Sequence, residues 1–315
     1  NVAIVGEGRA EESVIDGRGC FWWAQRLSGK DALPFCRPQL VNFVSSSHIE
    51  MSAITLKDPA FWNTHLWNSS WIHVHDANFV ASPADAGRCA PTKPGEKIVA
   101  VNSDGIDVDS SKHVLIERVY IHAGDDAVAC KSGMNVPGQA FNVSPQNVTV
   151  RHSVLVSNDF AIGSECSGGC EDISLLDSTI SDAAGSAIDV LRLKSGEGRG
   201  GYIRNILVRN VTALNLQNKA RPSDAFRCTV SGGSSPTPVS NITIQDVHVV
   251  QAAGMAGQFL GDPKAKWTGL YIRNVSVGNR LKPDWECSNI EDGHFVDVTP
   301  AVEPSSSCAK FVGDL

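Results

Sequence analysis

The sequence predicts an all-β protein built as a single-stranded, right-handed parallel β-helix. The first observation behind this prediction is composition: the 315 residues include 33 Val and 19 Ile but only 18 Leu. β-branched residues fit the pleated surface of a sheet better than a helix. The second observation is a unit of short apolar/polar alternations that recurs along most of the chain. Alternation with a period of two is typical of a strand with one buried face.

The repeated unit consists of one alternation, a polar break and a second alternation. Its first apolar residue is separated from that of the next unit by 23, 42, 34, 25, 33 and 36 residues. The units show no 3.6-residue period, and no Asn-Gly hairpin signal lies between them. Irregular units of this kind favour parallel coils stacked on one another over a helical repeat or a β-propeller. The first apolar residues of the units are Ile49, Ile72, Val114, Val148, Ile173, Ile206 and Ile242.

Loops and chain ends interrupt the repeat. We expect loops over residues 86–96, 131–145 and 217–238, where the spacing widens. The repeat is lost after residue 280, so we expect a β-helix domain over 1–280. Residues 281–315 are expected to form a C-terminal cap on the same domain, because an open stack would expose a sheet edge. No cap is visible at the N-terminal end.

Composition also limits the classes of partner. The net charge of −7 argues against a nucleic-acid binder, which needs a basic surface. No stretch approaches the ~18 consecutive apolar residues of a transmembrane helix, so no membrane association is expected. We expect a monomer with a sizeable core, since 42% of the residues are hydrophobic.

The nine cysteines allow two interpretations, a set of buried thiols or a secreted protein with disulfides. Cys287 and Cys308 flank a short segment and are predicted to close a loop. Cys166 and Cys170 surround Ser-Gly-Gly and are close enough to bridge. Cys130 lies in an apolar run and is predicted to be a buried free thiol. No C-x-x-C pair is present, so no zinc site is expected.

Six N-x-S/T sequons occur. If the chain is secreted, some of them are expected to carry glycans. The alternative is that each Asn forms a turn, because several of them open a strand pattern. They lie at Asn68, Asn142, Asn147, Asn210, Asn241 and Asn274.

Acidic residues recur at intervals of about one coil. Asp104 and Asp126 are 22 residues apart, with Asp125 adjacent, so stacking would gather the three carboxylates on one edge. Carboxylates that lie this close together repel each other, so the pKa of at least one of them should rise. A protonated acid beside an ionised base is the arrangement that glycoside hydrolysis needs.

Basic residues follow on the same predicted edge. Gly163 comes 37 residues after Asp126, and Arg192 comes 29 residues after Gly163. Arg192 and Lys194, with Lys131, would supply positive charge for an anionic sugar such as a uronate. Two simpler alternatives remain: the acidic segments are turns, or they bind Ca²⁺.

Several motifs occur together in a specific order. They are Asp16-Gly-Arg-Gly with Trp22-Trp23, Arg37-Pro-Gln-Leu, Phe61-Trp-Asn63, Asn102-Ser-Asp-Gly-Ile-Asp107, Gly124-Asp-Asp126 and Arg192-Leu-Lys194. Together they resemble glycoside hydrolase family 28, the polygalacturonase family, from about Val14 to Gly278. The resemblance implies a right-handed parallel β-helix that hydrolyses α-1,4 bonds between galacturonates with inversion and without a metal or other cofactor.

The resemblance also implies roles for individual residues. Asp125 resembles the general acid, and Asp104 and Asp126 resemble the pair that holds and activates the water. Arg192 and Lys194 resemble the residues that grip a galacturonate carboxylate. The other substrate-binding residues implied by the resemblance are Asn102, Lys131, Ser164 and Glu165.

The sequence departs from the family pattern at the usual Gly-His-Gly, which here is Gly163-Ser164-Glu165. This form is similar to a subgroup with exo-acting members and plant polygalacturonase-like proteins, which favours exo cleavage. Family members carry a further N-terminal segment, so we expect a fragment of a secreted, extracellular or cell-wall protein. We expect the substrate to be pectic polysaccharide or oligogalacturonides. The alternatives are a non-catalytic wall-binding β-helix and a Ca²⁺-dependent pectate lyase.

Overall fold

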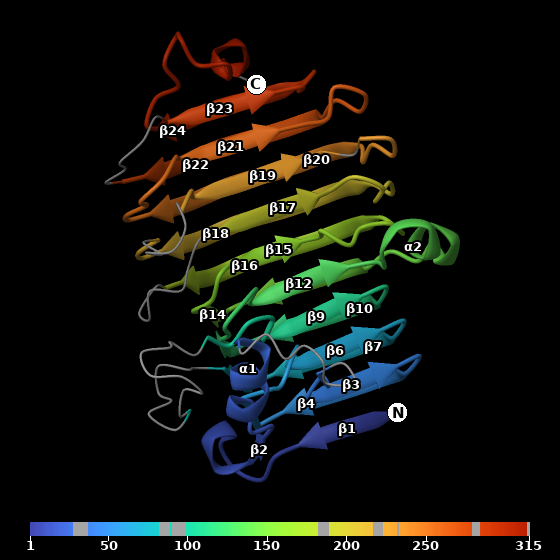
Figure 1. Ribbon diagram of the computed structural model, residues 1–315. Coiled ribbons are helices and arrows are strands. Elements are labelled where there is room, and N and C mark those ends of the chain that lie inside the picture. Colours follow the sequence, from blue (N-terminus) through green and yellow to red (C-terminus); the bar gives the residue numbers. More distant parts are fainter. Residues whose placement is uncertain are drawn as a thin grey trace.

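The computed structural model describes residues 1–27, 37–81, 89, 99–181, 189–216, 223–231, 233–278 and 284–313. Their strands pair in parallel and stack coil on coil along one axis (Figure 1). The predicted fold class, a right-handed parallel β-helix, is confirmed. Among these residues no helix is long and apolar enough to cross a membrane.

The first column of strands runs the length of the stack. Its early members are four to six residues long. From β16 onward they lengthen to seven to eleven residues, because the strands of the first two columns fuse. The column comprises β1 (Val2–Val5), β4 (Ser47–Ser52), β7 (Ser70–His75), β10 (Lys112–Glu117), β13 (Gln146–Arg151), β16 (Cys170–Ile180), β18 (Ile203–Ala213), β20 (Val239–Val249), β22 (Thr268–Val277) and β24 (Gly293–Thr299).

The second column consists of short strands that follow the first column around a corner. It ends where β14 pairs with the last residues of β16, which places both columns in one sheet. The column comprises β2 (Val14–Asp16), β5 (Thr55–Lys57), β8 (Asn78–Val80), β11 (Tyr120–His122) and β14 (Val154–Leu155).

The third column forms a separate sheet on another face of the stack, and it carries the acidic motifs. From β17 onward its strands alternate buried and more exposed residues, whereas β9, β12 and β15 beside the site are buried almost throughout. The column comprises β3 (Val41–Val44), β6 (Thr64–Trp67), β9 (Ile106–Asp109), β12 (Val128–Lys131), β15 (Phe160–Ile162), β17 (Leu191–Ser195), β19 (Phe226–Val230), β21 (Gly257–Leu260) and β23 (Trp285–Ser288).

The core is a set of ladders in which like residues stack along the axis. The seven first apolar residues of the predicted units are consecutive register partners, and each is at most 2% exposed. Each coil adds one β-branched side chain to the ladder, and its methyl groups pack on those of the coils on either side. Burying such a side chain contributes about 1.5–3 kcal/mol. The ladder therefore confirms both the predicted unit and its register.

The six sequon asparagines all have a positive φ, between 49° and 54°, which turns the chain locally. Asn tolerates this left-handed conformation better than most residues. Five of the six side chains also hydrogen-bond to a neighbouring coil, as Asn241 does to Asn205 and Asn210 does to Asp177. The interpretation of these asparagines as turn residues is confirmed.

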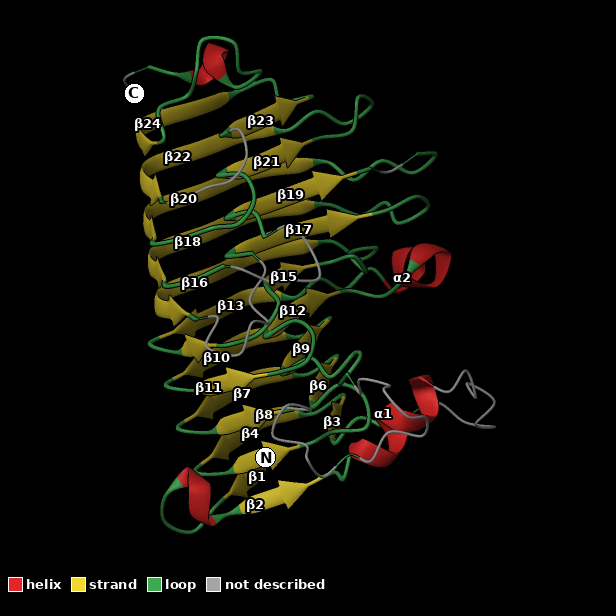
Figure 2. Ribbon diagram, turned by 60° about the vertical axis from the view of Figure 1, so that its left-hand side comes forward, coloured by secondary structure: helices red, strands yellow, loops and turns green. Residues whose placement is uncertain are grey.

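Two helices interrupt the strands. Helix α1 (Cys20–Leu27) lies beside the lower coils, and α2 (Asn135–Phe141) projects next to β12 and β15 (Figure 2). Helix α2 falls inside the loop predicted over 131–145. The loop predicted over 217–238 contains a strand, β19, where the expectation of irregular structure was wrong. The loop over 86–96 lies outside the described residues except for Cys89.

The C-terminal part continues the stack beyond the predicted boundary at residue 280. Strand β23 pairs with β21 and β24 pairs with β22, both in parallel. The polar residues of this last coil hid its alternation in the sequence. The short helix η2 (Ala309–Phe311) then packs on β24, and Phe311 is buried. The covering segment thus begins after Thr299.

The disulfides agree in part with the sequence. Cys287–Cys308 is present, and Cys130 is a buried free thiol, as predicted. Cys166 and Cys170 are free, with their sulfur atoms 2.6 Å apart. A second disulfide, Cys20–Cys89, spans 69 residues, and no local pattern in the sequence indicates it.

Candidate active site

The predicted site residues lie on the outer face of the third column. Asp104 precedes β9, and Asp125 and Asp126 precede β12 one coil later. The amide of Gly105 donates to the carbonyl oxygen of Asp126 (3.0 Å), which sets Asp104 beside Asp126. The 22-residue interval therefore corresponds to one coil, as predicted. Lys131 ends β12, and Lys194 lies on β17.

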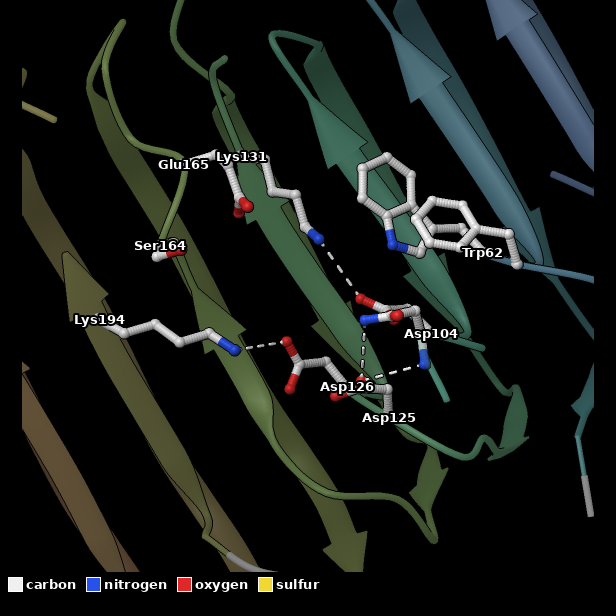
Figure 3. A pocket seen from close by; sticks show the side chains of 11 residues that line it. Trp62, Asp104, Asp125, Asp126, Lys131, Ser164, Glu165 and Lys194 are labelled. Atoms are coloured by element: carbon white, nitrogen blue, oxygen red, sulfur yellow. Dashed lines mark hydrogen bonds and ion pairs between the residues drawn. The ribbon is translucent and has the colours of Figure 1, made fainter. Parts of the chain in front are cut away.

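These residues surround a pocket of about 250 Å³ (Figure 3). The three aspartates lie together on one side, two lysines reach in from the strands, and Glu165 lies next to Lys131 (Figure 3). Eight of the nine predicted site residues line it. The complete lining is Phe61, Trp62, Asn102, Asp104, Asp125, Asp126, Lys131, Gly163, Ser164, Glu165 and Lys194.

Lys131 is held in the pocket wall by two carboxylates and a ring. Its Nζ lies 2.8 Å from Asp107 Oδ1 and 3.4 Å from Asp104 Oδ2. It also lies over the Trp62 ring, 4.1 Å from the centroid. Burial raises the pKa of Asp104 well above its usual range, and the Asp107 carboxylate adds to the rise. Asp107 lies within β9, and its carboxylate anchors Lys131.

Lys194 forms the second ion pair of the pocket. Its Nζ donates to Asp126 Oδ2 at 2.8 Å. Burial alone would lower the pKa of Lys194, but the surrounding carboxylates, Asp126 foremost, together outweigh burial and the net shift is upward. Lys194 is therefore a permanent cation beside Asp126.

Asp125 is held by neutral groups rather than by a cation. Its Oδ2 accepts a hydrogen bond from the backbone nitrogen of Asn102 at 3.3 Å, and its Oδ1 accepts one from Asn158 Nδ2 at 3.2 Å. Burial raises the pKa of Asp125, and repulsion from Asp126 raises it further. A carboxyl group in this setting keeps its proton to a higher pH, which suits an acid catalyst.

Two buried carboxylate oxygens in the pocket have no hydrogen-bond partner among the described residues. They are Asp104 Oδ1 and Asp126 Oδ1, on the residues that stand side by side in consecutive coils. Buried polar atoms in folded proteins are nearly always satisfied, by protein or by water. The two oxygens therefore fit a shared polar ligand such as a water molecule.

The Gly163–Glu165 segment turns away from the end of β15 and closes one side of the pocket. Gly163 has a φ of 96°, and a Cβ there would overlap the carbonyl oxygen of Lys194. The segment is fixed to the previous coil, because the Ser132 amide donates to the Glu165 carbonyl oxygen at 2.6 Å. Ser164 and Glu165 thus present their side chains from a rigid turn.

Arg192 is the predicted site residue that the structure does not bring into the pocket. Its Nη1 donates to Asp189 Oδ2 at 3.0 Å, and it lies beside Arg227 in the sheet. Asp189 is fully buried and three residues earlier in the chain. The motif pattern did not indicate this ion pair.

The sequence analysis missed Phe61, Trp62 and Arg37 as parts of the site. Phe61 and Trp62 stack on each other and line the pocket. Arg37 donates to Asn102 Oδ1 at 2.9 Å and lies over the Phe61 ring, so it orients the residue that holds Asp125. All three belong to motifs that carried the family resemblance, and that was the available signal.

Comparison with known proteins decides the family. The sequence model of glycosyl hydrolases family 28 matches residues 3–299. The chain belongs to glycosyl hydrolase family 28. Among curated family 28 relatives, the protein named "Probable polygalacturonase" from Vitis vinifera is 30% identical over 304 residues, which cover 92% of this chain and 56% of that protein. An endopolygalacturonase from Neosartorya fischeri, also named as probable, is 24% identical over 81% of this chain and 49% of its own.

This family 28 chain therefore spans about half the length of the curated relatives that it matches. Solved structures show the same fold. The exopolygalacturonase from Thermotoga maritima superposes with a TM-score of 0.69 at 20% identity, over 96% of this chain and 70% of that one. Endopolygalacturonase I from Stereum purpureum, solved with two galacturonates, has a TM-score of 0.61 at 12% identity, over 93% and 82%.

Proposed function

We propose that this family 28 chain hydrolyses α-1,4 galacturonosyl linkages in pectic polysaccharide or oligogalacturonides with inversion. Its curated relatives are named as polygalacturonases. Gly163-Ser164-Glu165, in place of the Gly-His-Gly of typical endo-acting members, favours cleavage from a chain end.

The proposal depends above all on how the three aspartates differ. Asp125 has a raised pKa and only neutral partners, which suits protonation of the leaving oxygen. Asp104 and Asp126 lie in adjacent coils, and each has one buried carboxylate oxygen without a hydrogen-bond partner among the described residues. Inverting hydrolysis needs this division, with an acid for the glycosidic oxygen and carboxylates that hold a water molecule.

The mechanism then assigns one step to each group. Asp125 donates its proton to the glycosidic oxygen as the bond to the anomeric carbon breaks. Asp126, fixed by Lys194, takes the proton of the attacking water on the opposite face of the sugar, and Asp104, whose pKa burial raises well above its usual range, helps to orient that water. The Lys194–Asp126 pair fixes the Asp126 carboxylate, and Lys194 also places positive charge where a uronate carboxylate lies.

The proposed activity is tested by incubating the folded protein with polygalacturonate and with defined oligogalacturonides and assaying new reducing ends. We expect reducing ends to appear, and we expect Asp125→Asn to lower the rate at least about 100-fold. Asp292→Asn, at a half-exposed carboxylate near the C-terminal end, is the control and should keep full activity. No product from any pectic substrate would contradict the proposal, and an unsaturated product absorbing in the ultraviolet would assign a lyase instead.

We further propose that the protein is secreted and acts as a monomer outside the cell or in a cell wall. The Cys20–Cys89 and Cys287–Cys308 disulfides support an oxidising compartment. Exposed sequon asparagines such as Asn142 and Asn241 are open to glycosylation there. Secretion from a eukaryotic host, followed by mass spectrometry of the intact protein, tests both points.

A further inference from the structure

The three cations predicted for substrate binding are each paired with a carboxylate of the protein itself. Lys131 pairs with Asp107, Lys194 with Asp126, and Arg192 with Asp189, each at 2.8–3.0 Å. A negatively charged sugar would have to share each of these cations with a protein carboxylate. A site for uronates therefore calls for positive charge that the protein has not already neutralised.

Arg199 supplies such a charge next to the pocket. Its Nε donates to the carbonyl oxygen of Ser164 at 3.2 Å, and its Nη1 donates to Asn135 Oδ1 at 2.6 Å. Ser164 lines the pocket, so the guanidinium lies against the backbone of the pocket wall. Both of its partners are uncharged. Among the residues that the structure describes, no carboxylate forms an ion pair with Arg199.

The loop that carries Arg199 is built to hold this position. It connects β17 to β18, and Gly198, Gly200 and Gly201 all have φ between 62° and 78°. Gln139 of α2 donates to the carbonyl oxygens of Gly198 (3.0 Å) and Arg199 (2.9 Å). A Cβ on Gly201 would overlap the carbonyl oxygen of Cys166, so close backbone packing keeps the loop in place.

The geometry of the guanidinium matches a carboxylate. Arginine has five N–H donors in a planar fork, and two of the five are used by Ser164 and Asn135. The remaining donors include both hydrogens of Nη2, which allow the two-point contact that arginine makes with carboxylates. Partial burial of Arg199 strengthens that contact relative to one made in bulk water.

We propose that Arg199 binds the carboxylate of a galacturonate unit on the Ser164 side of the pocket, and so selects free-acid over methyl-esterified sugar at that subsite. The inference rests on the proposed function and adds a residue to its substrate recognition. Arg199 acts by binding substrate and takes no part in proton transfer.

The test measures binding separately from turnover. In the Asp125→Asn background, calorimetry gives the affinity for trigalacturonate and for its fully methyl-esterified form. We expect Arg199→Ala to weaken trigalacturonate binding about 10- to 100-fold, which is the range of a charged hydrogen-bonded contact. Binding of the ester should change less than twofold, and Arg199→Lys should restore part of the loss.

Arg209→Ala is the matched control, because Arg209 is an exposed arginine of the same coil on β18, in the first column. It should leave both affinities unchanged. Equal losses for acid and ester in Arg199→Ala would show that Arg199 only supports the loop, and no loss would show that it does not touch the substrate; either result overturns the proposal. Hydrolysis by the unmutated protein decides the proposed function on its own, so the two failures are distinguishable.

Discussion

Lys131 lines the pocket and is nevertheless almost completely buried. It ends β12 at an outward-facing position, yet it is only 6% exposed because Asp107, Asp104 and Trp62 surround it. Burial raises the pKa of Asp107 to about 6 even though Lys131 opposes the rise. The Asp107–Lys131 ion pair therefore forms at a cost in desolvation, which suits a carboxylate that holds the Lys131 side chain in place.

Removing one partner of this pair should reveal its contribution. We expect Asp107→Ala to lower the free energy of unfolding by about 3–5 kcal/mol, because it leaves Lys131 buried without its nearest carboxylate. Asp109→Ala changes the next outward position of β9, where the carboxylate meets His65 at 3.3 Å, and should cost about 1 kcal/mol. Urea titrations of both variants measure the difference, and equal losses would contradict the anchoring role of Asp107.

Individual site residues were predictable where residues of the same chemical type recur at a spacing of about one coil. Asp104 and Asp126 follow that interval, and motif order indicated Lys194. Substrate binding by Arg192 stays a prediction, and its ion pair with Asp189, a buried carboxylate three residues earlier, was not visible in the sequence. Contacts such as Asn158 with Asp125 depend on how adjacent coils are aligned, which composition and spacing do not reveal.

At the scale of the element, the ladder of apolar residues carries the stability of each coil. Ile173 of β16 is fully buried between Val148 and Ile206, its register partners in the coils on either side. We expect Ile173→Ala to lower the free energy of unfolding by about 2–5 kcal/mol, since it removes buried methyl groups and leaves a cavity.

The neighbouring residue of the same strand provides the control. Ser174 points outward and is half-buried, so Ser174→Ala should change stability by less than about 0.5 kcal/mol. Thermal or chemical unfolding of the two variants tests the register directly. Similar effects at both positions would mean that the inward and outward faces of β16 are assigned incorrectly.

Strands were predictable from the sequence wherever inward β-branched residues alternate with polar ones. The prediction failed at β19, since Phe226–Val230 lies within a polar segment, and at β23 and β24, where few residues show the alternation. The Cys20–Cys89 disulfide joins residues 69 positions apart. Such long-range pairing depends on the folded chain and leaves no local signal.

At the scale of the whole molecule, buried carboxylates divide into two groups with opposite effects on stability. Burial raises the pKa of Asp189, as of Asp107, to about 6. Hydrogen bonds from arginine and histidine lower the pKa of Glu117, despite its burial, to about 2. A raised carboxyl pKa means that the folded state binds the proton more tightly, so stability falls as pH rises.

The two groups predict an acidic optimum of stability. As pH falls from about 4.5 toward 2, the free energy of unfolding should decrease, because Glu117, whose pKa is about 2 in the folded state, becomes protonated. Between about pH 4 and 6, stability should fall with rising pH as Asp107 and Asp189 ionise. Melting temperatures from pH 2 to 8 measure both limbs. Glu117→Gln should make the acid limb shallower and leave the other limb unchanged; Asp76, whose pKa is also lowered to about 2, keeps part of the slope. A melting temperature that rises steadily up to pH 7 would contradict the account.

The central claim is that the three aspartates divide the work of inverting hydrolysis, and the configuration of the first product tests it most directly. Proton NMR during hydrolysis of trigalacturonate distinguishes the α and β anomers of the newly formed reducing end before they interconvert. Attack of water opposite an α linkage predicts that the β anomer appears first and the α anomer grows in later. An α anomer appearing first would require a covalent intermediate, and it would contradict the roles assigned to Asp104, Asp125 and Asp126.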